Sequence, residues 1–145
     1  MSDETIAPGR PGGPARRRRA QGTKSDQLMT AMAQLDPQLV DWANGFIFGE
    51  LWAREGLSHD ERLLVAITAL GAGGNVDQLR TYAWGALQAG VPASKIHEAL
   101  VMLVVYRGFP HTLSVLSVWR QVVEGARKAG IDIDIPAPVE PGAGG

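Results

Sequence analysis

One short stretch, NVDQLRTYAWGALQAGV at residues 75–91, sets side chains that could do chemistry among small residues. Arg80 supplies a cation. Tyr82 supplies a hydroxyl whose ordinary pKa of about 10 makes it chiefly a donor at neutral pH. It could therefore donate to an oxygen that gains negative charge, or it could be a buried tyrosine with a satisfied hydroxyl. Trp84 could line such a site or serve only in packing.

Three more residues are candidates for chemistry. Glu50 stands four residues before Arg54, so the two could act in a site or could pair on a helix surface. Arg54 could also complement the dipole of a helix end. His111 falls in the first turn of a predicted helix, where its cation is disfavoured, and a neutral imidazole suits a base or a hydrogen-bonding partner. His59 and His97 are expected to face solvent.

The composition predicts one compact domain and excludes several chemistries. The chain has 145 residues, of which 45% are hydrophobic, so it can bury a core. It has no cysteine, which excludes disulfides, thiolate catalysis and cysteine-based metal sites. The three histidines are scattered without the spacing of metal ligands, so we expect no metal site.

The charge is unevenly distributed along the chain. Residues 1–24 hold six Arg/Lys and two Asp/Glu, which leaves the remainder with a net charge of −5. This mildly acidic remainder argues against a nucleic-acid partner. No apolar run reaches the ~18 residues that a membrane span needs, and we expect no membrane association. The N-terminus has no hydrophobic signal, so the expected location is cytoplasmic.

Apolar spacing, caps and helix breakers predict an all-α single domain of about six helices. No alternation of period two is long enough to make a sheet. A capping-box pattern, Ser58 with Glu61, precedes the third helix. The predicted helices span residues 26–35, 37–54, 62–72, 75–89, 92–108 and 110–130.

The two ends of the chain are predicted to be tails. Residues 1–24 are rich in Arg, Gly and Pro and have too little apolar area to repay their ordering. The four arginines at 16–19 could be an electrostatic arm for an anionic partner or a solubilising tail. Residues 131–145 form a Pro/Gly-rich C-terminal tail, which leaves 25–130 as the helical domain.

Two of the predicted helices are apolar on nearly every face. They lie at residues 62–72 and 99–106. A domain of this size does not have enough interior to surround both. The sequence therefore predicts burial against other subunits in a homo-oligomer.

Four segments in this order and spacing resemble the carboxymuconolactone decarboxylase family: FIFGELWAREGLSHDERLLVAITAL, QLRTYAWGALQAGV, KIHEAL and VVYRGFP. The resemblance implies an alkylhydroperoxidase D-like all-α subunit that forms trimers or hexamers. It also implies an active cavity near QLRTYAWGAL, a small-molecule substrate, and no metal or organic cofactor. A related branch uses a Cys-x-x-Cys pair, whose positions fall here on Asn75 and Gln78, so that branch's chemistry is excluded.

The resemblance also suggests roles for individual residues. Tyr82 stands in place of the family's histidine, with Arg80 two positions before it as in the family, and Trp84 stands where an arginine is common. The run GE-x-W-x-R is matched by Glu50, Trp52 and Arg54. The expected catalytic residues are Tyr82, Glu50 and His111, and the expected substrate-binding residues are Arg80, Trp84, Trp52 and Arg54.

The implied function is a cofactor-independent lyase of the decarboxylase type. It would act on a small or medium cyclic carbonyl compound, a lactone or related acid, through an enolate. Because tyrosine donates but does not readily accept a proton, the substrate is expected to differ from that of the namesake enzyme. The alternatives are an isomerase, eliminating enzyme or cyclase of a biosynthetic pathway, and a binding or scaffold member without catalysis.

Overall fold

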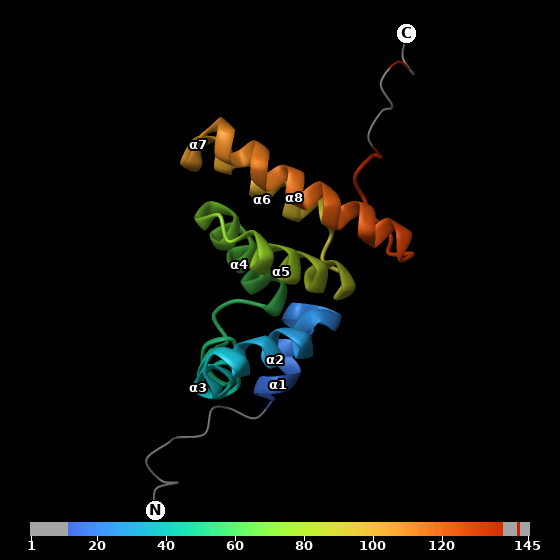
Figure 1. Cartoon of the computed structure of the whole chain (residues 1–145). Coiled ribbons are helices and arrows are strands. Elements are labelled where there is room, and N and C mark those ends of the chain that lie inside the picture. Colours follow the sequence, from blue (N-terminus) through green and yellow to red (C-terminus); the bar gives the residue numbers. More distant parts are fainter. Residues whose placement is uncertain (1–11, 138–141, 143–145) are drawn as a thin grey trace, which may run out of the picture.

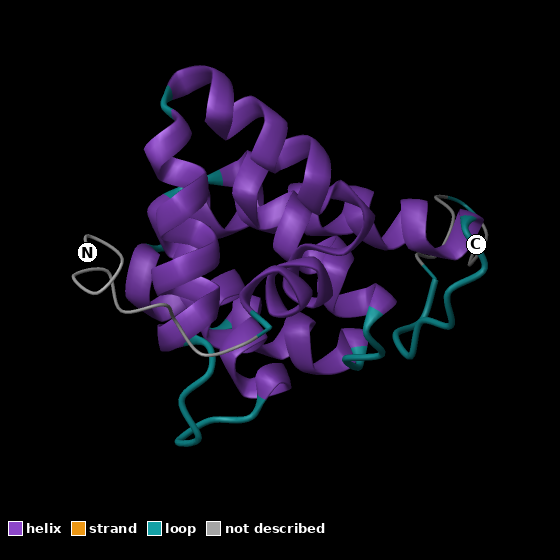
Figure 2. Ribbon diagram, turned by 90° about the horizontal axis from the view of Figure 1, so that it is seen from below, coloured by secondary structure: helices purple, strands orange, loops and turns teal. Residues whose placement is uncertain are grey.

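The computed structural model of the chain describes residues 12–137 and 142, and all regular structure in this part is helical (Figures 1 and 2). The all-α prediction is therefore confirmed. The elements are α1 (Gly13–Gln21), η2 (Gly22–Lys24), α2 (Ser25–Leu35), α3 (Pro37–Trp42), the π-helix η3 (Ala43–Leu51), α4 (His59–Gly73), α5 (Val76–Gln88), α6 (Ala93–Val101), α7 (Leu103–Arg107) and α8 (Phe109–Lys128).

The six predicted helices appear with small changes at their ends. Asp36 caps α3 by accepting a hydrogen bond from the Gln38 amide at 2.9 Å. The capping box is present at α4, where Glu61 N–H donates to Ser58 Oγ at 3.1 Å and Ser58 N–H donates back to Glu61 Oε1 at 2.9 Å. Asn75 occupies the position before α5, but its side chain makes no capping bond. The predicted second helix continues from α3 into the wider π turns of η3.

The helices stack in three layers (Figure 1). α8 lies over α6 and α7 in one layer, α4 and α5 form the middle layer, and α1 to η3 form the third. α5 touches both outer layers, since it packs on α8 and on α1. The largest buried side chains of the core include Phe48, Leu63, Ile67, Leu79 and Ile96. α5 is therefore the element through which the predicted site residues reach the rest of the molecule.

The prediction that residues 1–24 form a tail is wrong for residues 13–24. Residues 13–21 form α1, which packs against η3 and α5, and Ala20 is fully buried. α1 is held by polar contacts and close backbone approach, because Arg16 Nη1 donates to the Phe48 carbonyl at 3.0 Å and Gly13 lies against the Asn44 carbonyl. A prediction based on apolar area alone does not register contacts of this kind. Residues 1–11 lie outside the described part.

The predicted C-terminal tail is also wrong in its first residues. Ile131, Ile133 and Ile135 are partly buried against the core. Asp134 accepts hydrogen bonds from the backbone N–H and the hydroxyl of Ser94, at 2.8 and 2.6 Å, at the start of α6. Residues 131–137 therefore belong to the folded body. Most of the remaining predicted tail, residues 138–141 and 143–145, lies outside the described part.

Candidate active site

An aromatic cluster forms where η3 ends. Its centre is Trp52, whose backbone N–H donates to the Ile47 carbonyl at 2.8 Å in the five-residue spacing of a π turn. The Trp52 ring lies 5.2 Å from Phe48, 5.4 Å from His59 and 6.2 Å from Tyr82, measured between ring centroids. Residues from η3, α4 and α5 thus meet around one indole. π turns are frequent at functional sites because they re-aim the side chains that follow.

Tyr82 is partly buried in this cluster, and its hydroxyl has one partner. Gln21 Nε2, at the end of α1, donates to the Tyr82 oxygen at 3.2 Å. Burial raises the pKa of Tyr82 above its usual value, and the hydrogen bond from Gln21 opposes this rise only in part. Tyr82 is therefore neutral at physiological pH. Its own hydrogen has no acceptor among the described residues, so the group is arranged to donate.

A pocket of about 270 Å³ is lined in part by Trp52, but Tyr82 is not among its lining residues. Arg62 enters it among apolar side chains, and Arg62 Nη2 donates to the Arg54 carbonyl at 2.8 Å. Arg62 Nε is buried and has no hydrogen-bond partner. A guanidinium with an unused N–H in an apolar pocket is suited to a carboxylate. The pocket is lined by Leu51, Trp52, Leu57, Arg62, Val65 and Ala66.

Glu50 and Arg54 lie beside this pocket. Both side chains are exposed and line a hollow of about 370 Å³ together with Phe46 and Leu51. Leu51 also lines the Trp52 pocket, so the two hollows share a wall. The surface pairing considered for Glu50 and Arg54 is not formed, since no ion pair joins these two described residues. The structure therefore gathers Glu50, Trp52 and Arg54 at the same end of η3.

Arg80 and Trp84 lie elsewhere. They line a pocket of about 190 Å³ with Lys24, Gln121 and neighbouring residues of α8, and Trp84 Nε1 donates to the Thr23 hydroxyl at 3.1 Å. In an α-helix, two positions correspond to a rotation of about 200°, so Tyr82 points away from the face that carries its neighbours two positions before and after. The structure thus separates Arg80 and Trp84 from the aromatic cluster.

His111 ties α8 to the end of α4. Its Nδ1 lies 3.2 Å from Arg107 Nη2, and its Nε2 lies 2.7 Å from the Gly71 carbonyl oxygen. A guanidinium only donates and a carbonyl only accepts, so Nδ1 carries the lone pair and Nε2 carries the hydrogen. Both ring nitrogens are therefore occupied by the protein. His111 is not brought to Tyr82 by these contacts.

Sequence reasoning missed several residues of this region. His59 was expected to face solvent, yet it is half-buried against Trp52 and its Nε2 is buried without a partner. Burial, followed by the nearby charge of Arg19, lowers the pKa of His59. Gln21 was hidden in a segment predicted to be a tail. Among these missed residues, only Arg62 could have been predicted from the sequence as a site residue. It lies one turn into an apolar helix, where a charge needs a partner or a ligand.

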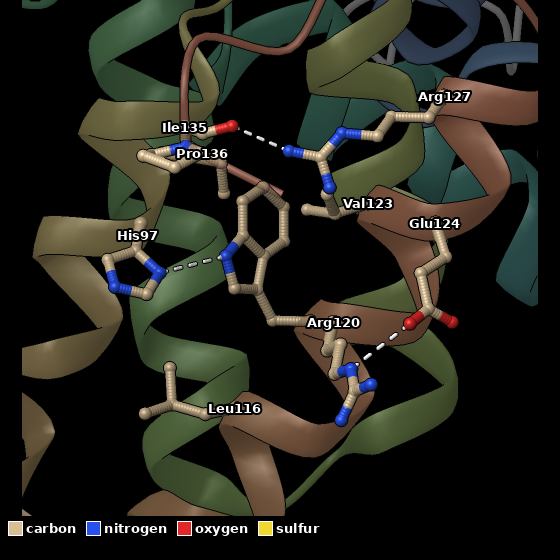
Figure 3. A pocket seen from close by; sticks show the side chains of 9 residues that line it. His97, Leu116, Arg120, Val123, Glu124, Arg127, Ile135 and Pro136 are labelled. Atoms are coloured by element: carbon tan, nitrogen blue, oxygen red, sulfur yellow. Dashed lines mark hydrogen bonds and ion pairs between the residues drawn. The ribbon is translucent and has the colours of Figure 1, made fainter. Parts of the chain in front are cut away.

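A separate pocket of about 210 Å³ lies between α6, α8 and the C-terminal segment (Figure 3). Trp119 Nε1 donates to His97 Nδ1 at 3.3 Å, so the expectation that His97 faces solvent is also wrong. Arg120 pairs with Glu124 at 3.0 Å, and Arg127 Nη2 donates to the Ile135 carbonyl at 2.6 Å (Figure 3). The charged groups around this pocket thus satisfy one another, and none of the predicted site residues lines it.

The described part contains neither a cluster of metal-ligating side chains nor a helix that could span a membrane. No three His, Asp or Glu side chains lie close enough together there to hold a metal ion. None of the described helices is both long enough and apolar enough to cross a bilayer.

Comparison with known proteins identifies the family of the chain. Residues 37–121 match the model of the carboxymuconolactone decarboxylase family. A similar relative is a 4-carboxymuconolactone decarboxylase of Acinetobacter baylyi, which is 31% identical over 77 residues. That alignment covers 53% of this chain and 58% of the relative. The match includes every predicted site residue and more than half of the chain, and the chain therefore belongs to the carboxymuconolactone decarboxylase family.

Proposed function

We propose that this protein is a cofactor-independent enzyme of the decarboxylase type that acts on a small or medium cyclic carbonyl compound, a lactone or related acid, through an enolate. One observation carries the proposal: the Tyr82 oxygen accepts a hydrogen bond from Gln21, which leaves the Tyr82 hydrogen for a ligand oxygen. Membership of the family and the name of the Acinetobacter relative support the reaction class.

The reaction makes three demands. The bond between the ring carbon and the carboxylate carbon breaks, carbon dioxide leaves, and the electron pair moves into the adjacent carbonyl as an enolate. The catalyst must bind and desolvate the carboxylate, stabilise the enolate oxygen, and return a proton to carbon. No further electron acceptor is needed, because the substrate carbonyl holds the electron pair.

The site offers a group for each demand. The Arg62 guanidinium, which lines the pocket beside Trp52, binds the carboxylate between apolar side chains. Tyr82, neutral at physiological pH, donates to the enolate oxygen. Glu50 in the adjoining hollow is the candidate that carries a proton from solvent to carbon. Arg54 and Trp52 hold the ring. Arg80, Trp84 and His111, which contact other parts of the chain, are not used in this scheme.

The assembly is part of the proposal. The outer face of α4 is hollowed over about 470 Å³ and lined by Leu64, Val65, Thr68, Ala69 and Ala72. A second apolar face lies over α7 and the start of α8, where Val105 is 79% exposed, Tyr106 71% and Phe109 62%. Two such faces on one small subunit favour a closed homo-oligomer, a trimer or a hexamer.

A second candidate is a member that binds a ligand without turning it over. It is favoured by one observation, that Arg80 lines a pocket that Tyr82 does not line, so fewer polar groups converge on one cavity than the family resemblance implies. An isomerase or cyclase on the same site is a third possibility. It would differ from the lyase in the group that the substrate loses when the enolate forms.

A single panel of experiments separates these functions. Purified protein is incubated with carboxylated lactones and cyclic keto acids, and carbon dioxide release, product mass and heat of binding are measured. Carbon dioxide with a product that is lighter by that mass supports the lyase. A product of unchanged mass indicates the isomerase or cyclase. Saturable binding without any product indicates the binding member and contradicts the proposed function.

A further inference from the structure

The N-terminal helix α1 and the first residue of α2 supply most of the buried polar side chains in the described part. Within the described part, only four polar or charged side chains are buried. Three of them are Arg17, Gln21 and Ser25, each at most 3% exposed. Burying a polar group costs free energy unless it is hydrogen-bonded, and burying a cation costs more. Their burial side by side therefore calls for an explanation from their contacts.

These three residues form a hydrogen-bonded chain that runs to Tyr82. Arg17 Nη1 donates to Ser25 Oγ. Ser25 Oγ donates to Gln21 Oε1 at 2.9 Å, and Gln21 Nε2 donates to the Tyr82 oxygen at 3.2 Å. Arg17 Nε is held in turn by Asn44 Oδ1, at 2.8 Å, from η3.

The hydrogen bonds in this series all run in one direction, from Arg17 to Tyr82. A guanidinium has donors only, so the Ser25 hydroxyl oxygen must accept from Arg17. The single hydroxyl hydrogen of Ser25 is then donated to the Gln21 side-chain carbonyl oxygen. This fixes the orientation of the Gln21 amide and aims its N–H at Tyr82. The Tyr82 oxygen thus accepts a hydrogen bond from within the protein, which leaves its own hydrogen free to donate.

The charge of Arg17 acts along this chain. Donors in series polarise one another, and the effect is larger where water is excluded. The counter-charge is exposed and shared: the side chain of Asp26 is 71% exposed and lies 3.4 Å from the same Arg17 Nη1 that donates to Ser25, and 3.1 Å from Arg18 Nε. Both arginines lower the pKa of Asp26, Arg18 more than Arg17. Arg17 is therefore the charged group at the start of the hydrogen-bonded chain that ends at Tyr82.

We propose that Arg17 is a positioning residue that acts through Ser25 and Gln21 to orient Tyr82 and to strengthen its hydroxyl as a donor to the substrate. The inference rests on the proposed function for the role of the substrate, but the coupling between Arg17 and Tyr82 is a property of the protein alone. The arginine-rich segment thereby has a role inside the site.

The test is an alkaline titration of Tyr82 without substrate. The chain has two tyrosines, so a Tyr106→Phe background leaves Tyr82 as the sole source of the tyrosinate absorbance. Arg17→Met removes the charge and the donors while keeping much of the length. We expect its titration midpoint to rise by about 0.5 pH or more relative to the background. Arg17→Lys, which keeps the charge, should lie between the two. The matched control is Arg18→Gln on the exposed side of α1, which should leave the midpoint unchanged.

The direction in which the Tyr82 midpoint moves distinguishes a relay, in which Arg17 acts on Tyr82 through the hydrogen-bonded chain, from a role of Arg17 in holding α1 in place. If Arg17→Met merely released α1, Tyr82 would become more exposed to solvent. Its titration midpoint would then fall, because burial is the main cause of its raised pKa. In that case Ser25→Ala, which interrupts the chain and keeps Arg17, decides the matter. A rise in the midpoint of Ser25→Ala supports the relay. An unchanged midpoint in a folded Ser25→Ala or Arg17→Met protein overturns it.

Activity gives an independent reading. In the Arg17→Met protein the alkaline limb of kcat should move with the titration of Tyr82, and kcat should fall about tenfold or more with little change in KM. Full activity of Tyr82→Phe would contradict the proposed function, while the substrate-free titration would still report on the relay.

Discussion

Gly85 lies so close to the carbonyl oxygen of Ala20 that a β-carbon at position 85 would come within 2.1 Å of it. The contact joins the middle of α5 to the last turn of α1, one residue before Gln21. Real β-carbons do not approach a backbone oxygen so closely, so only glycine allows α1 to sit at this distance. The same approach brings Gln21 to Tyr82, and the close packing of α1 is therefore linked to the candidate site.

Substitution of Gly85 tests whether α1 is an integral part of the fold. Gly85→Ala should push α1 away and lower the free energy of unfolding by about 1–3 kcal/mol, seen as a lower Tm. Gly125→Ala on α8 is the matched control. A β-carbon there meets nothing closer than Trp84, at 3.8 Å, and alanine favours a helix. An unchanged Tm for Gly85→Ala would show that α1 does not pack as described.

Tyr82→Phe keeps the ring and removes the hydroxyl. If Tyr82 donates to the enolate oxygen, turnover should fall by roughly a hundredfold or more, the usual scale for losing one positioned donor. Stability should change by only about 1 kcal/mol, from the Gln21 N–H left without its acceptor. Turnover is compared with Tyr106→Phe, whose ring is 71% exposed. Equal turnover of the two variants would leave Tyr82 a packing residue.

His59 should make stability depend on pH. Its folded pKa is lowered by burial, so between that value and the unfolded value the unfolded chain binds more protons. Stability therefore falls as the pH drops from neutral through the ordinary histidine range. His59→Gln should flatten this part of a plot of Tm against pH, whereas His97→Gln serves as the control. If the plot of Tm against pH has the same slope in the wild type and in His59→Gln, the proton uptake on unfolding belongs to other groups.

Two arginines can be compared directly as carboxylate ligands. Arg62→Gln should raise KM for a carboxylated substrate about tenfold or more, because it removes the buried charge in the Trp52 pocket. Binding of the methyl ester of the same compound should change little. Arg80→Gln, in the pocket of Trp84, should have the smaller effect. The reverse order would assign the carboxylate to Arg80, which the sequence predicts to bind substrate.

Light scattering tests the assembly. We expect a mass of three or six times the 15.5 kDa subunit at micromolar concentration, because two apolar faces are exposed on the single chain. Val105→Glu, at a valine that is 79% exposed, should lower the mass by placing a charge in one interface. Recovery of a 15.5 kDa particle from the unaltered protein would refute the oligomer.

Helix-forming patterns were readable without the structure because they depend on near neighbours. The Ser58–Glu61 capping box joins residues three positions apart and appears as predicted, and the Asp36 cap joins residues two positions apart. The matched motifs at Glu50, Trp52 and Arg54 likewise stand close together on the chain, and the structure keeps them at one end of η3.

Contacts across long stretches of sequence could not be read in the same way. Gln21 and Tyr82 are 61 positions apart, and nothing in the composition of residues 13–24 marks them as packed, since their contacts are hydrogen bonds from arginine and glutamine rather than apolar area. Arg80 and Tyr82 are two positions apart on the chain, yet helix geometry places Arg80 in the pocket with Trp84 and Tyr82 against Trp52 and Gln21.

What the sequence by itself determined is therefore the helical class, the helix ends and the family, all of which follow from local pattern. Which side chains share a site was decided only by tertiary structure. Helix rotation separated Tyr82 from Arg80, and the close approach of α1 to α5 at Gly85 brought a buried arginine into hydrogen-bonded connection with the candidate donor.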